Sequence, residues 1–430
     1  MTGPHYDALV VGSGPAGSIA ALVLARGGAR VALVDKARFP RDKACGDLVG
    51  PRGVQTLADL GVRIDGPRVG DMDVVGPTGR RVLLRASAGD TYPGHALVAA
   101  RLQMDDTLHR LAAEAGAEPY TGRAAAARYS GTGQLEGFDL DTGKGGPRQL
   151  TGDVVIGADG ALSRVAAAAG LVNESEVLWA FAVRTYMEGA PPLPRIHFWE
   201  PHPWAGYPGY GWVFPGAAGD ANVGLGVGTR SDRRPGARAA RDLGAFVASA
   251  GLDPARVGRT LGGWIKMGMV GTNPAGGRTM LVGDAAGLVN PLQGEGIAQA
   301  LASGRAAAEA FLAAGADGAA ERYRSEIGGR YAPYAATTAP LTGWMVDHPG
   351  AVAHLSRVLT APGIAPLLSG GWAIFWNDLL EGARPGGRRQ VARLADRVGR
   401  LLTSRAADRR SVWASVTAPG ERPPVASGTR

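Results

Sequence analysis

The stretch from Tyr6 to Asp35 limits the fold of this chain more than any other segment. Residues 8–11 form a short apolar run, as expected for a buried strand of a parallel sheet, and Gly12, Gly14 and Gly17 follow it in a G-x-G-x-x-G pattern. The first glycine of such a pattern permits a tight turn, the second lets a pyrophosphate approach the backbone, and the third lets the next helix pack closely. The stretch therefore predicts a strand, a turn and a helix that together bind a dinucleotide.

The two ends of this predicted helix support the same interpretation. Pro15 stands where the helix begins, a position that needs no backbone N–H, and the free amides of the first turn can bind phosphate. A second strand over residues 31–34 then brings Asp35 to the ribose hydroxyl groups. In this stretch we predict the following dinucleotide-binding residues: Gly12, Gly14, Pro15, Ala16, Gly17, Asp35 and Lys36.

Length and composition set broad limits. A chain of 430 residues can bury a large core and form about two or three structural units. No apolar run is long enough to span a membrane, and the N-terminus enters a strand without a signal-peptide pattern, so we expect a cytoplasmic protein. The single cysteine, Cys45, excludes an internal disulfide and a multi-cysteine metal site, and the histidines show no metal-ligand spacing, so we expect no metal.

The positive charge points to a partner only near the C-terminus. The formal net charge of +8 reflects an arginine-rich composition that is also rich in glycine. Residues 384–410 contain nine arginines against two aspartates, and Arg389, Arg393, Arg397 and Arg400 fall on one face of a predicted helix. Such a face is most often solvated, but it could also meet an acidic electron-carrier protein or a membrane surface with anionic lipid. No nucleic-acid-binding module accompanies the charge, so we expect no nucleic-acid partner.

A charged loop follows the second strand and carries the cysteine. Residues 39–47 read FPRDKACGD, which is too polar for a core element. Together with the dinucleotide pattern, this loop resembles the geranylgeranyl reductase family of FAD-dependent enzymes, within the wider group of flavoproteins folded like p-hydroxybenzoate hydroxylase. The resemblance implies that the loop lies beside the flavin, with Cys45 on the substrate side and cofactor contacts at Lys43, Gly46 and Asp47. By residue type alone, Cys45 could equally be a small buried hydrophobe.

Two further segments resemble the wider flavoprotein group. Arg101 stands at a strand-to-helix junction, where an arginine of the group reaches back to FAD; an exposed arginine at a helix start is the alternative. The helix predicted over 102–116 would turn Leu102 inward. A later apolar strand ends in Asp159 and Gly160, which the resemblance assigns to the FAD ribose region. No second G-x-G-x-x-G occurs, so the sequence predicts no separate NADPH domain.

Residues 176–274 differ in character, because aromatic residues are frequent and the pattern favours antiparallel strands. Tyr210, Trp212 and Phe214 alternate along one predicted strand, so they share a face and can wall an apolar cavity. The segment matches the family's YxWxFP…GxG signature; a plain aromatic sheet core is the alternative. From this signature, with one nearby aromatic residue added, we predict substrate contacts at Tyr210, Trp212, Phe214, Pro215, Gly224 and Trp264.

The chain then repeats the pattern of its opening. Residues 279–283 predict a strand that ends in a Gly-Asp pair, and the resemblance places Asp284 near the ribityl or pyrophosphate part of FAD. Residues 290–297, NPLQGEGI, lead into a helix predicted to run through Phe311, whose N-terminal dipole would favour an anionic reduced flavin. In this part we predict FAD contacts at Gly283, Asp284, Gly294, Gly296 and Ile297.

These segments together predict an α/β fold with a Rossmann-like FAD-binding domain, a mixed or antiparallel β-sheet substrate domain and a helical C-terminal region. The resemblance extends from the N-terminus to the start of the predicted C-terminal helices. The expected domains are an FAD-binding domain at 1–70, 96–175 and 275–330, a substrate-binding domain at 71–95 and 176–274, a helical region at 331–414 and a flexible tail at 415–430.

The motifs imply an FAD-dependent oxidoreductase but leave its reaction open. The family's reductases saturate a prenyl double bond, whereas related enzymes of natural-product biosynthesis use O₂ to epoxidise or hydroxylate. Lys266 stands where many of these reductases have proline, and Gln293 where several have threonine or asparagine. The sequence therefore slightly favours an O₂-dependent monooxygenase that acts on a C=C bond of a terpenoid-type molecule, with saturation of prenyl double bonds as the alternative. Cys45 and Lys266 are the candidate catalytic residues.

The partners are predicted only by class. We expect a hydrophobic small-molecule substrate and either NADPH or a reduced ferredoxin as electron donor. A flavin halogenase is disfavoured because residues 210–215 lack that class's WxWxIP pattern. A non-catalytic FAD-binding module is disfavoured because the pocket signature is intact. The oligomeric state is not predicted.

Overall fold

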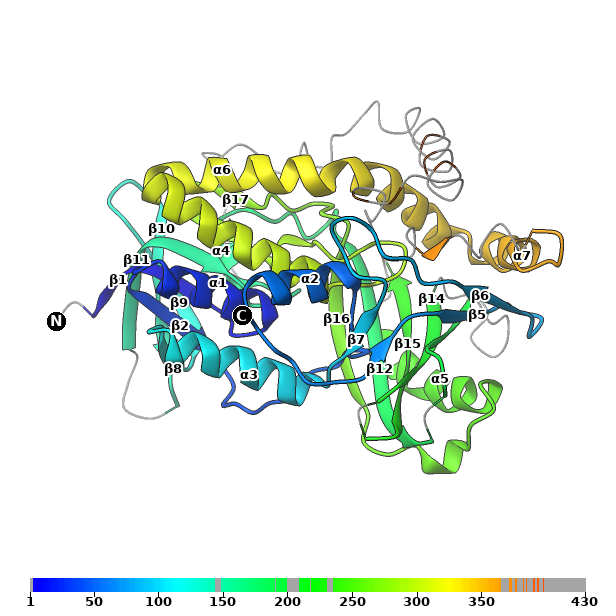
Figure 1. Cartoon of the computed structure of the whole chain (residues 1–430). Coiled ribbons are helices and arrows are strands. Elements are labelled where there is room, and N and C mark those ends of the chain that lie inside the picture. Colours follow the sequence, from blue (N-terminus) through cyan, green and yellow to red (C-terminus); the bar gives the residue numbers. More distant parts are fainter. Residues whose placement is uncertain are drawn as a thin grey trace, which may run out of the picture.

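The computed structural model describes residues 3–364 except 144–147, 190, 199–208, 217 and 230–234, together with residues 371, 372, 376, 382, 384, 390, 393 and 397. Figure 1 shows two large β-sheets beside each other, with helices packed over the first sheet and a long helical segment extending toward the second. The predicted α/β class, with its Rossmann-like part, its second sheet and its C-terminal helices, is confirmed.

The first sheet forms around β1 (His5–Val11), which lies between β11 (Arg148–Gly157) and β2 (Val31–Asp35) and is parallel to both. The strand order is β17-β18-β11-β1-β2-β8, and β10 and β9 continue antiparallel from β11. Residues 8–11 are at most 4% exposed, because a central parallel strand is buried on both faces. The other strands are β8 (Glu118–Thr121), β9 (Arg123–Tyr129), β10 (Leu135–Asp141), β17 (Ala275–Gly276) and β18 (Thr279–Leu281).

The helix α3 (Arg101–Glu114) shows that the positions of leucines alone do not predict which face of a helix is buried. α1 (Pro15–Arg26) packs against α3. The prediction that Leu102 points inward is wrong, because this side chain is 44% exposed. α3 begins one residue earlier than predicted, and its buried face is formed by Arg101, Met104, Asp105, Leu108 and Ala112 at helical spacing. A buried arginine and a buried aspartate therefore take the inward positions of the first turns.

The second sheet separates an apolar core from a cavity. Its strand order is β16-β12-β15-β14-β13-β5-β6, and all pairs are antiparallel except β13 with β5. α5 (Pro235–Ser249) covers one face, where Val213 and Phe246 share a cluster, while Trp212 and Phe214 lie on the opposite face. The strands are β5 (Met72–Val75), β6 (Arg81–Leu84), β12 (Leu178–Glu188), β13 (Arg195–Phe198), β14 (Gly209–Pro215), β15 (Asp220–Thr229) and β16 (Leu261–Met267).

Short elements connect the two sheets. A small sheet has the order β3-β7-β4, and α2 packs against the long helix α6. The short elements are β3 (Leu48–Val49), α2 (Pro51–Asp59), β4 (Arg68–Val69), β7 (Ala96–Val98), α4 (Arg164–Ala168), and the 3₁₀ turns η1 (Pro254–Arg256) and η2 (Gly283–Ala286).

The long helix α6 (Ile297–Asp347) reaches the same region twice. Its backbone leaves the helical conformation at Gly315, which has φ 65°, close to the end predicted at Phe311. The second part returns over the first sheet, where the Tyr323 hydroxyl donates to the Leu281 carbonyl at 2.6 Å (Figure 1). Further along, the Thr342 hydroxyl donates to the carbonyl of Pro291, just before the helix start. α7 (Pro349–Leu359) follows.

The C-terminal predictions fall mostly outside the described residues. Of the four arginines on the predicted basic face, Arg393 and Arg397 are described, and both are helical and exposed; Arg389, Arg400 and the tail at 415–430 lie outside. In the described part of the chain, no helix has both the length and the apolarity that crossing a membrane requires.

Candidate functional site

The glycine-rich turn leaves open space at one glycine and none at the other two. Gly12 has φ 104°, and a Cβ there would lie 2.2 Å from the Ala158 carbonyl oxygen. A Cβ at Gly17 would lie 1.8 Å from the carbonyl oxygen of Gly12. A Cβ at Gly14 would meet only an Arg41 nitrogen, at 3.6 Å. The space beside Gly14, at the N-terminus of α1, is therefore where an anion can approach the backbone.

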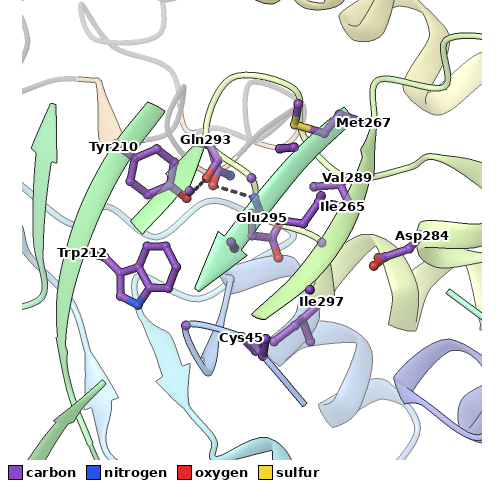
Figure 2. Close-up of a pocket in the computed structure, with 18 of the residues that line it drawn as sticks. Cys45, Tyr210, Trp212, Ile265, Met267, Asp284, Val289, Gln293, Glu295 and Ile297 are labelled. Carbon is purple, nitrogen blue, oxygen red and sulfur yellow. Dashed lines mark hydrogen bonds between the residues drawn. The ribbon is translucent and has the colours of Figure 1, made fainter. Parts of the chain in front are cut away.

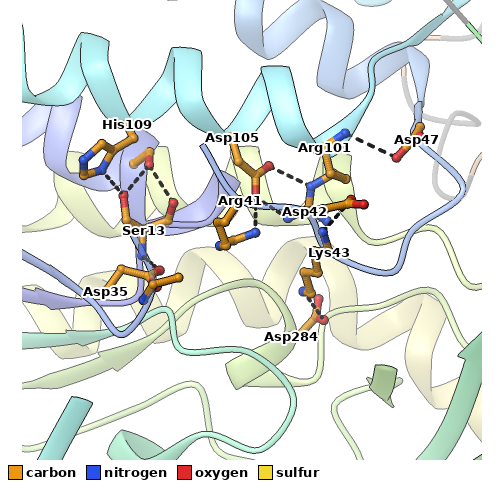
Figure 3. A network of polar contacts seen from close by, with 12 residues as sticks. Ser13, Asp35, Arg41, Asp42, Lys43, Asp47, Arg101, Asp105, His109 and Asp284 are labelled. Carbon is orange, nitrogen blue, oxygen red and sulfur yellow. Dashed lines mark hydrogen bonds and ion pairs between the residues drawn. The ribbon is translucent and has the colours of Figure 1, made fainter. Parts of the chain in front are cut away.

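A polar cluster at the end of β2 fixes the position of Asp35. Its two carboxylate oxygens accept hydrogen bonds from the backbone N–H groups of Ser13 and Ala37, each at 2.8 Å (Figure 3). The Ser13 hydroxyl lies 2.7 Å from Nδ1 of His109, and burial lowers the pKa of that histidine. Lys36 is exposed next to this cluster. The carboxylate is thus held at the strand end, where the sequence pattern predicts ribose binding.

Two arginines share one buried aspartate beside the glycine-rich turn. The Arg101 guanidinium binds Asp105 through two hydrogen bonds of 2.7 Å, and Nη1 of Arg41 donates to the same carboxylate at 2.8 Å (Figure 3). Asp105 is fully buried and Arg101 is 4% exposed. Two cations around one anion leave a net positive charge, which favours binding of a phosphate near Arg41 and Gly14.

Two of the predicted acids follow strands of the first sheet. Asp159 follows β11, and its carboxylate accepts a hydrogen bond of 2.5 Å from the Ser163 hydroxyl; Gly160 follows with φ 84°. Asp284 lies at the start of η2, with one carboxylate oxygen 3.5 Å from Nζ of Lys43 (Figure 3). Both acids therefore sit at the carboxyl ends of strands, where ligands of α/β sheets bind.

The loop that carries Cys45 is held by a buried acid. Asp47 is 1% exposed and has φ 60°, and its carboxylate accepts hydrogen bonds from the Tyr186 hydroxyl and from Nδ2 of Asn222, the latter at 2.8 Å. Asn222 also donates to the Cys45 carbonyl at 2.8 Å. Through these contacts Asp47 and Asn222 fasten the Cys45–Asp47 turn to the second sheet.

Between the two sheets lies a cavity of about 210 Å³ whose wall is mainly apolar. Cys45, from the loop after β2, and Trp212, from β14, both line it (Figure 2). Its wall includes predicted FAD-binding residues and predicted substrate-binding or catalytic residues, namely Pro15, Lys43, Cys45, Gly46, Arg101, Tyr210, Trp212, Phe214, Trp264, Asp284, Gly294, Gly296 and Ile297. It also includes residues that were not predicted, among them Ile265, Met267, Val289, Thr342, Met345 and Trp376. An apolar chain can thus lie against the region that the FAD motifs surround.

Several predicted residues lie outside this wall. Gly224 packs under Trp212, because a Cβ at Gly224 would lie 2.2 Å from that indole. Pro215 ends β14 next to the wall residue Phe214. The N-terminal glycines, Ala16 and Asp35 lie toward the dinucleotide end, and Gly283 supports the turn before Asp284.

The Cys45 thiol lies in the cavity wall and is not part of a disulfide. Its sulfur accepts a hydrogen bond of 3.4 Å from the Asp47 N–H. Burial raises the pKa of the Cys45 thiol, and the positive charge of Arg101 offsets only part of this rise. The thiol therefore keeps its proton at neutral pH and can donate it.

Lys266 lies behind the cavity wall, on a strand that the sequence pattern did not indicate. It is 1% exposed on β16, where its neighbours in sequence, Ile265 and Met267, line the cavity. Burial lowers its pKa to about 8, against the attraction of Asp159 and Asp284. A lysine in this position can influence the electrostatic potential around the cofactor, but it does not line the cavity where a substrate would lie.

Comparison with known proteins identifies the family. Residues 5–324 match the profile of an FAD-binding domain. Menaquinone reductase from Mycobacterium tuberculosis is 36% identical over 328 residues, which cover 70% of this chain and 76% of that protein. Geranylgeranyl diphosphate reductase from Rhodobacter capsulatus is 33% identical over 315 residues, covering 72% and 75%. The chain belongs to the geranylgeranyl reductase family of FAD-dependent oxidoreductases.

The fold agrees with this assignment. A geranylgeranyl bacteriochlorophyll reductase-like protein from Thermoplasma acidophilum superposes with a TM-score of 0.69 at 22% identity, covering 88% of this chain and 98% of that one. A flavin-dependent brominase and a Pseudomonas aeruginosa protein described as a probable FAD-dependent monooxygenase share the fold as well, so the fold alone does not distinguish reduction from oxygenation.

The residues present fit FAD. The open space at Gly14 and the net positive charge of the Arg41, Arg101 and Asp105 cluster suit a pyrophosphate, and Asp35 suits a ribose. Sequence reasoning missed Arg41 and Asp105. Arg41 lies in the loop that the family resemblance had singled out, and Asp105 stands four residues after Arg101, the spacing of an ion pair on a helix.

Proposed function

We propose that this oxidoreductase adds hydrogen across a C=C bond in the prenyl chain of a hydrophobic molecule, such as a menaquinone. The observation that carries the proposal is the protonated Cys45 thiol in the wall of an apolar cavity beside the FAD motifs. The relatives named as menaquinone and geranylgeranyl diphosphate reductases support this reaction over the oxygenation that the sequence slightly favoured.

The protein supplies a proton and a dry surface. Reduced FAD, when bound, supplies the hydride that such a reaction requires. As the hydride reaches one carbon of the double bond, the Cys45 thiol gives its proton to the other carbon and becomes a thiolate. The Arg101 guanidinium, whose charge favours the ionised thiol, stabilises that thiolate. Trp212, Phe214 and Met267 exclude water and hold the prenyl chain.

One experiment separates this proposal from its main alternative. The holoenzyme, reduced with dithionite without O₂, is mixed with a short-chain menaquinone, and the product is analysed by mass spectrometry. We expect a product with two additional hydrogen atoms in the prenyl chain. A product with one additional oxygen atom, formed only with O₂, would establish the second candidate, an O₂-dependent monooxygenase. That candidate is supported by Lys266 and Gln293, which differ from the usual residues of the family's reductases.

The electron donor is tested in the same assay. We propose NADPH or a small acidic carrier such as a reduced ferredoxin, the latter because of the arginines near Arg393 and Arg397. Replacing dithionite by each donor in turn identifies the one that bleaches the flavin absorption. Bleaching by ferredoxin that weakens at high salt would support docking on these arginines.

The cavity also adjoins an exposed apolar surface. On α6, Thr342 and Met345 line the cavity, while the neighbouring Leu341 and Trp344 are 40% and 43% exposed. We propose that these two side chains contact a membrane surface from which the prenyl substrate enters. Co-sedimentation with phospholipid vesicles, compared between the wild type and the double variant Leu341→Ser with Trp344→Ser, tests this; equal binding would contradict it.

A further inference from the structure

Gln293 presents an unpaired hydrogen-bond donor in the cavity wall. Its side chain is 6% exposed, and its Nε2 has no hydrogen-bond partner among the residues that the structure describes. Figure 2 shows this side chain close to Tyr210 and Glu295 at the edge of the cavity. A buried amide nitrogen without a partner is unfavourable in a native protein, so it marks a place where a ligand supplies the acceptor.

The orientation of this amide is fixed by its other contacts. Oε1 of Gln293 accepts a hydrogen bond of 2.9 Å from the backbone N–H of Glu295, so the nitrogen must be the unpaired end. The Gln293 carbonyl accepts a hydrogen bond from the Tyr210 hydroxyl. Its backbone N–H donates to Oδ1 of Asn290 at 3.3 Å. Each polar group of Gln293 except Nε2 is thus held by the loop or by β14, and the donor is rigidly presented.

The surroundings of Nε2 define the class of ligand. Met267, Val289 and Tyr210 line the same cavity as Gln293, and its wall is mainly apolar, so the acceptor belongs to a molecule that is mostly apolar. An apolar chain without an oxygen would bury the amide unpaired, and a site of this kind discriminates against such a molecule.

We propose that Gln293 determines specificity by donating a hydrogen bond from Nε2 to a carbonyl or hydroxyl oxygen of the substrate. This inference rests on the proposed function only in placing the prenyl substrate in this cavity.

The test compares two ligands of the same skeleton. The oxidised holoenzyme is titrated with farnesylacetone, a prenyl ketone, and with the hydrocarbon that lacks its carbonyl oxygen, and binding is followed by the change in flavin absorption. We expect the wild type to bind the ketone about 10-fold more tightly. Gln293→Met keeps the length of the side chain and loses the donor, and Gln293→Leu loses the donor with a shorter apolar side chain. Both should bind the two ligands equally.

A second buried glutamine provides the matched control. Gln299 is 3% exposed on α6 and lies outside the wall of this cavity. Gln299→Met should keep the preference for the ketone. A wild type without that preference, or Gln293 variants that retain it, would overturn the inference.

The flavin itself has carbonyl groups, and the same variants distinguish that source. If the amide served the flavin, both Gln293 variants would shift the reduction potential of the ligand-free holoenzyme and leave the ketone preference intact, which also overturns the inference. If the wild type binds neither compound, the proposed substrate class fails as well. If both bind and only the Gln293 effect is missing, the proposed function stands.

Discussion

The dinucleotide end and the cavity end of this site are built in different ways. At the dinucleotide end, one continuous segment supplies the turn, the helix N-terminus and Asp35, and the backbone contacts of Gly12 and Gly17 leave no room for variation. At the cavity end, the wall combines the Cys45 loop, strands of the second sheet, residues 289–297 and the far part of α6.

This difference separates two kinds of constraint. A local strand-turn-helix unit is restricted by close backbone approaches, which a sequence pattern records directly. A cavity assembled from distant segments is restricted by packing and by the partners of its polar groups, which a pattern records only in part. Substitutions at the two ends should therefore fail in different ways.

The largest expected effect is at Gly17. In Gly17→Ala the new Cβ would meet the Gly12 carbonyl oxygen at 1.8 Å, so the turn and α1 must separate. We expect a loss of about 3 kcal/mol or more in the free energy of unfolding of the apoprotein, measured in urea, and almost no bound flavin.

Gly14→Ala is the matched variant, since its Cβ meets no atom closer than 3.6 Å. It should change apoprotein stability by less than about 1 kcal/mol and weaken FAD binding by about 10-fold or more. Normal FAD affinity in Gly14→Ala would refute the pyrophosphate role of this position.

The next largest effect concerns the buried charge of Lys266 and the pH dependence of stability. Folding lowers the pKa of Lys266 from 10.5 to about 8, so between these pH values the unfolded chain binds more protons than the folded one. Burial of the lysine therefore lowers the free energy of unfolding of the apoprotein by its full amount below pH 8. This destabilisation disappears as the pH rises toward 10.5. We expect Lys266→Met to be more stable than the wild type by about 3 kcal/mol at pH 7, and this gap should shrink at pH 10. Urea unfolding of both proteins at the two pH values measures it. A gap independent of pH would show that the effect is packing rather than charge.

At the cavity end, Cys45→Ala should affect the reaction without affecting the fold. Loss of the proton donor should lower kcat about 100-fold, while the bound FAD and its absorption spectrum stay as in the wild type. Cys45→Ser, which keeps a hydroxyl at the same place, should retain more activity than alanine. Single-turnover reduction of a prenyl substrate measures this. Unchanged turnover in Cys45→Ala would assign the cysteine a packing role.

The smallest effect should come from Arg41. Arg41→Met removes one of the two cations beside Asp105, but the two hydrogen bonds from Arg101 remain, so the fold should stay intact. We expect about 3- to 10-fold weaker FAD binding, with a weaker dependence on salt than in the wild type. Equilibrium dialysis at two salt concentrations checks this. Unchanged affinity would place Arg41 away from the phosphates.

The sequence predicted several cavity residues correctly, although the cavity is assembled from segments that lie far apart in the chain. Alternation along one strand predicted that Tyr210, Trp212 and Phe214 share a face, and all three line the cavity. Period-2 alternation is local, so it needs no knowledge of what packs opposite. Only the start of the inward face of α3 was misjudged, because the buried ion pair of Arg101 and Asp105, rather than Leu102, takes the inward positions there.

The sequence by itself determined the parts whose geometry depends on neighbouring residues. These are the glycine-rich turn, the strand ends that carry Asp35, Asp159 and Asp284, and the family to which the chain belongs. Each depends on contacts within a short segment, where residue type and spacing fix the backbone.

Only the tertiary structure decided which polar groups in and around the site have hydrogen-bond partners. Asp105 joins two arginines from different segments, Asn222 and Tyr186 fasten Asp47, and the amide of Gln293 is left as a free donor among the described residues. The physical reason is that hydrogen-bond satisfaction depends on partners brought together from distant parts of the chain. A pattern in one segment does not contain that information.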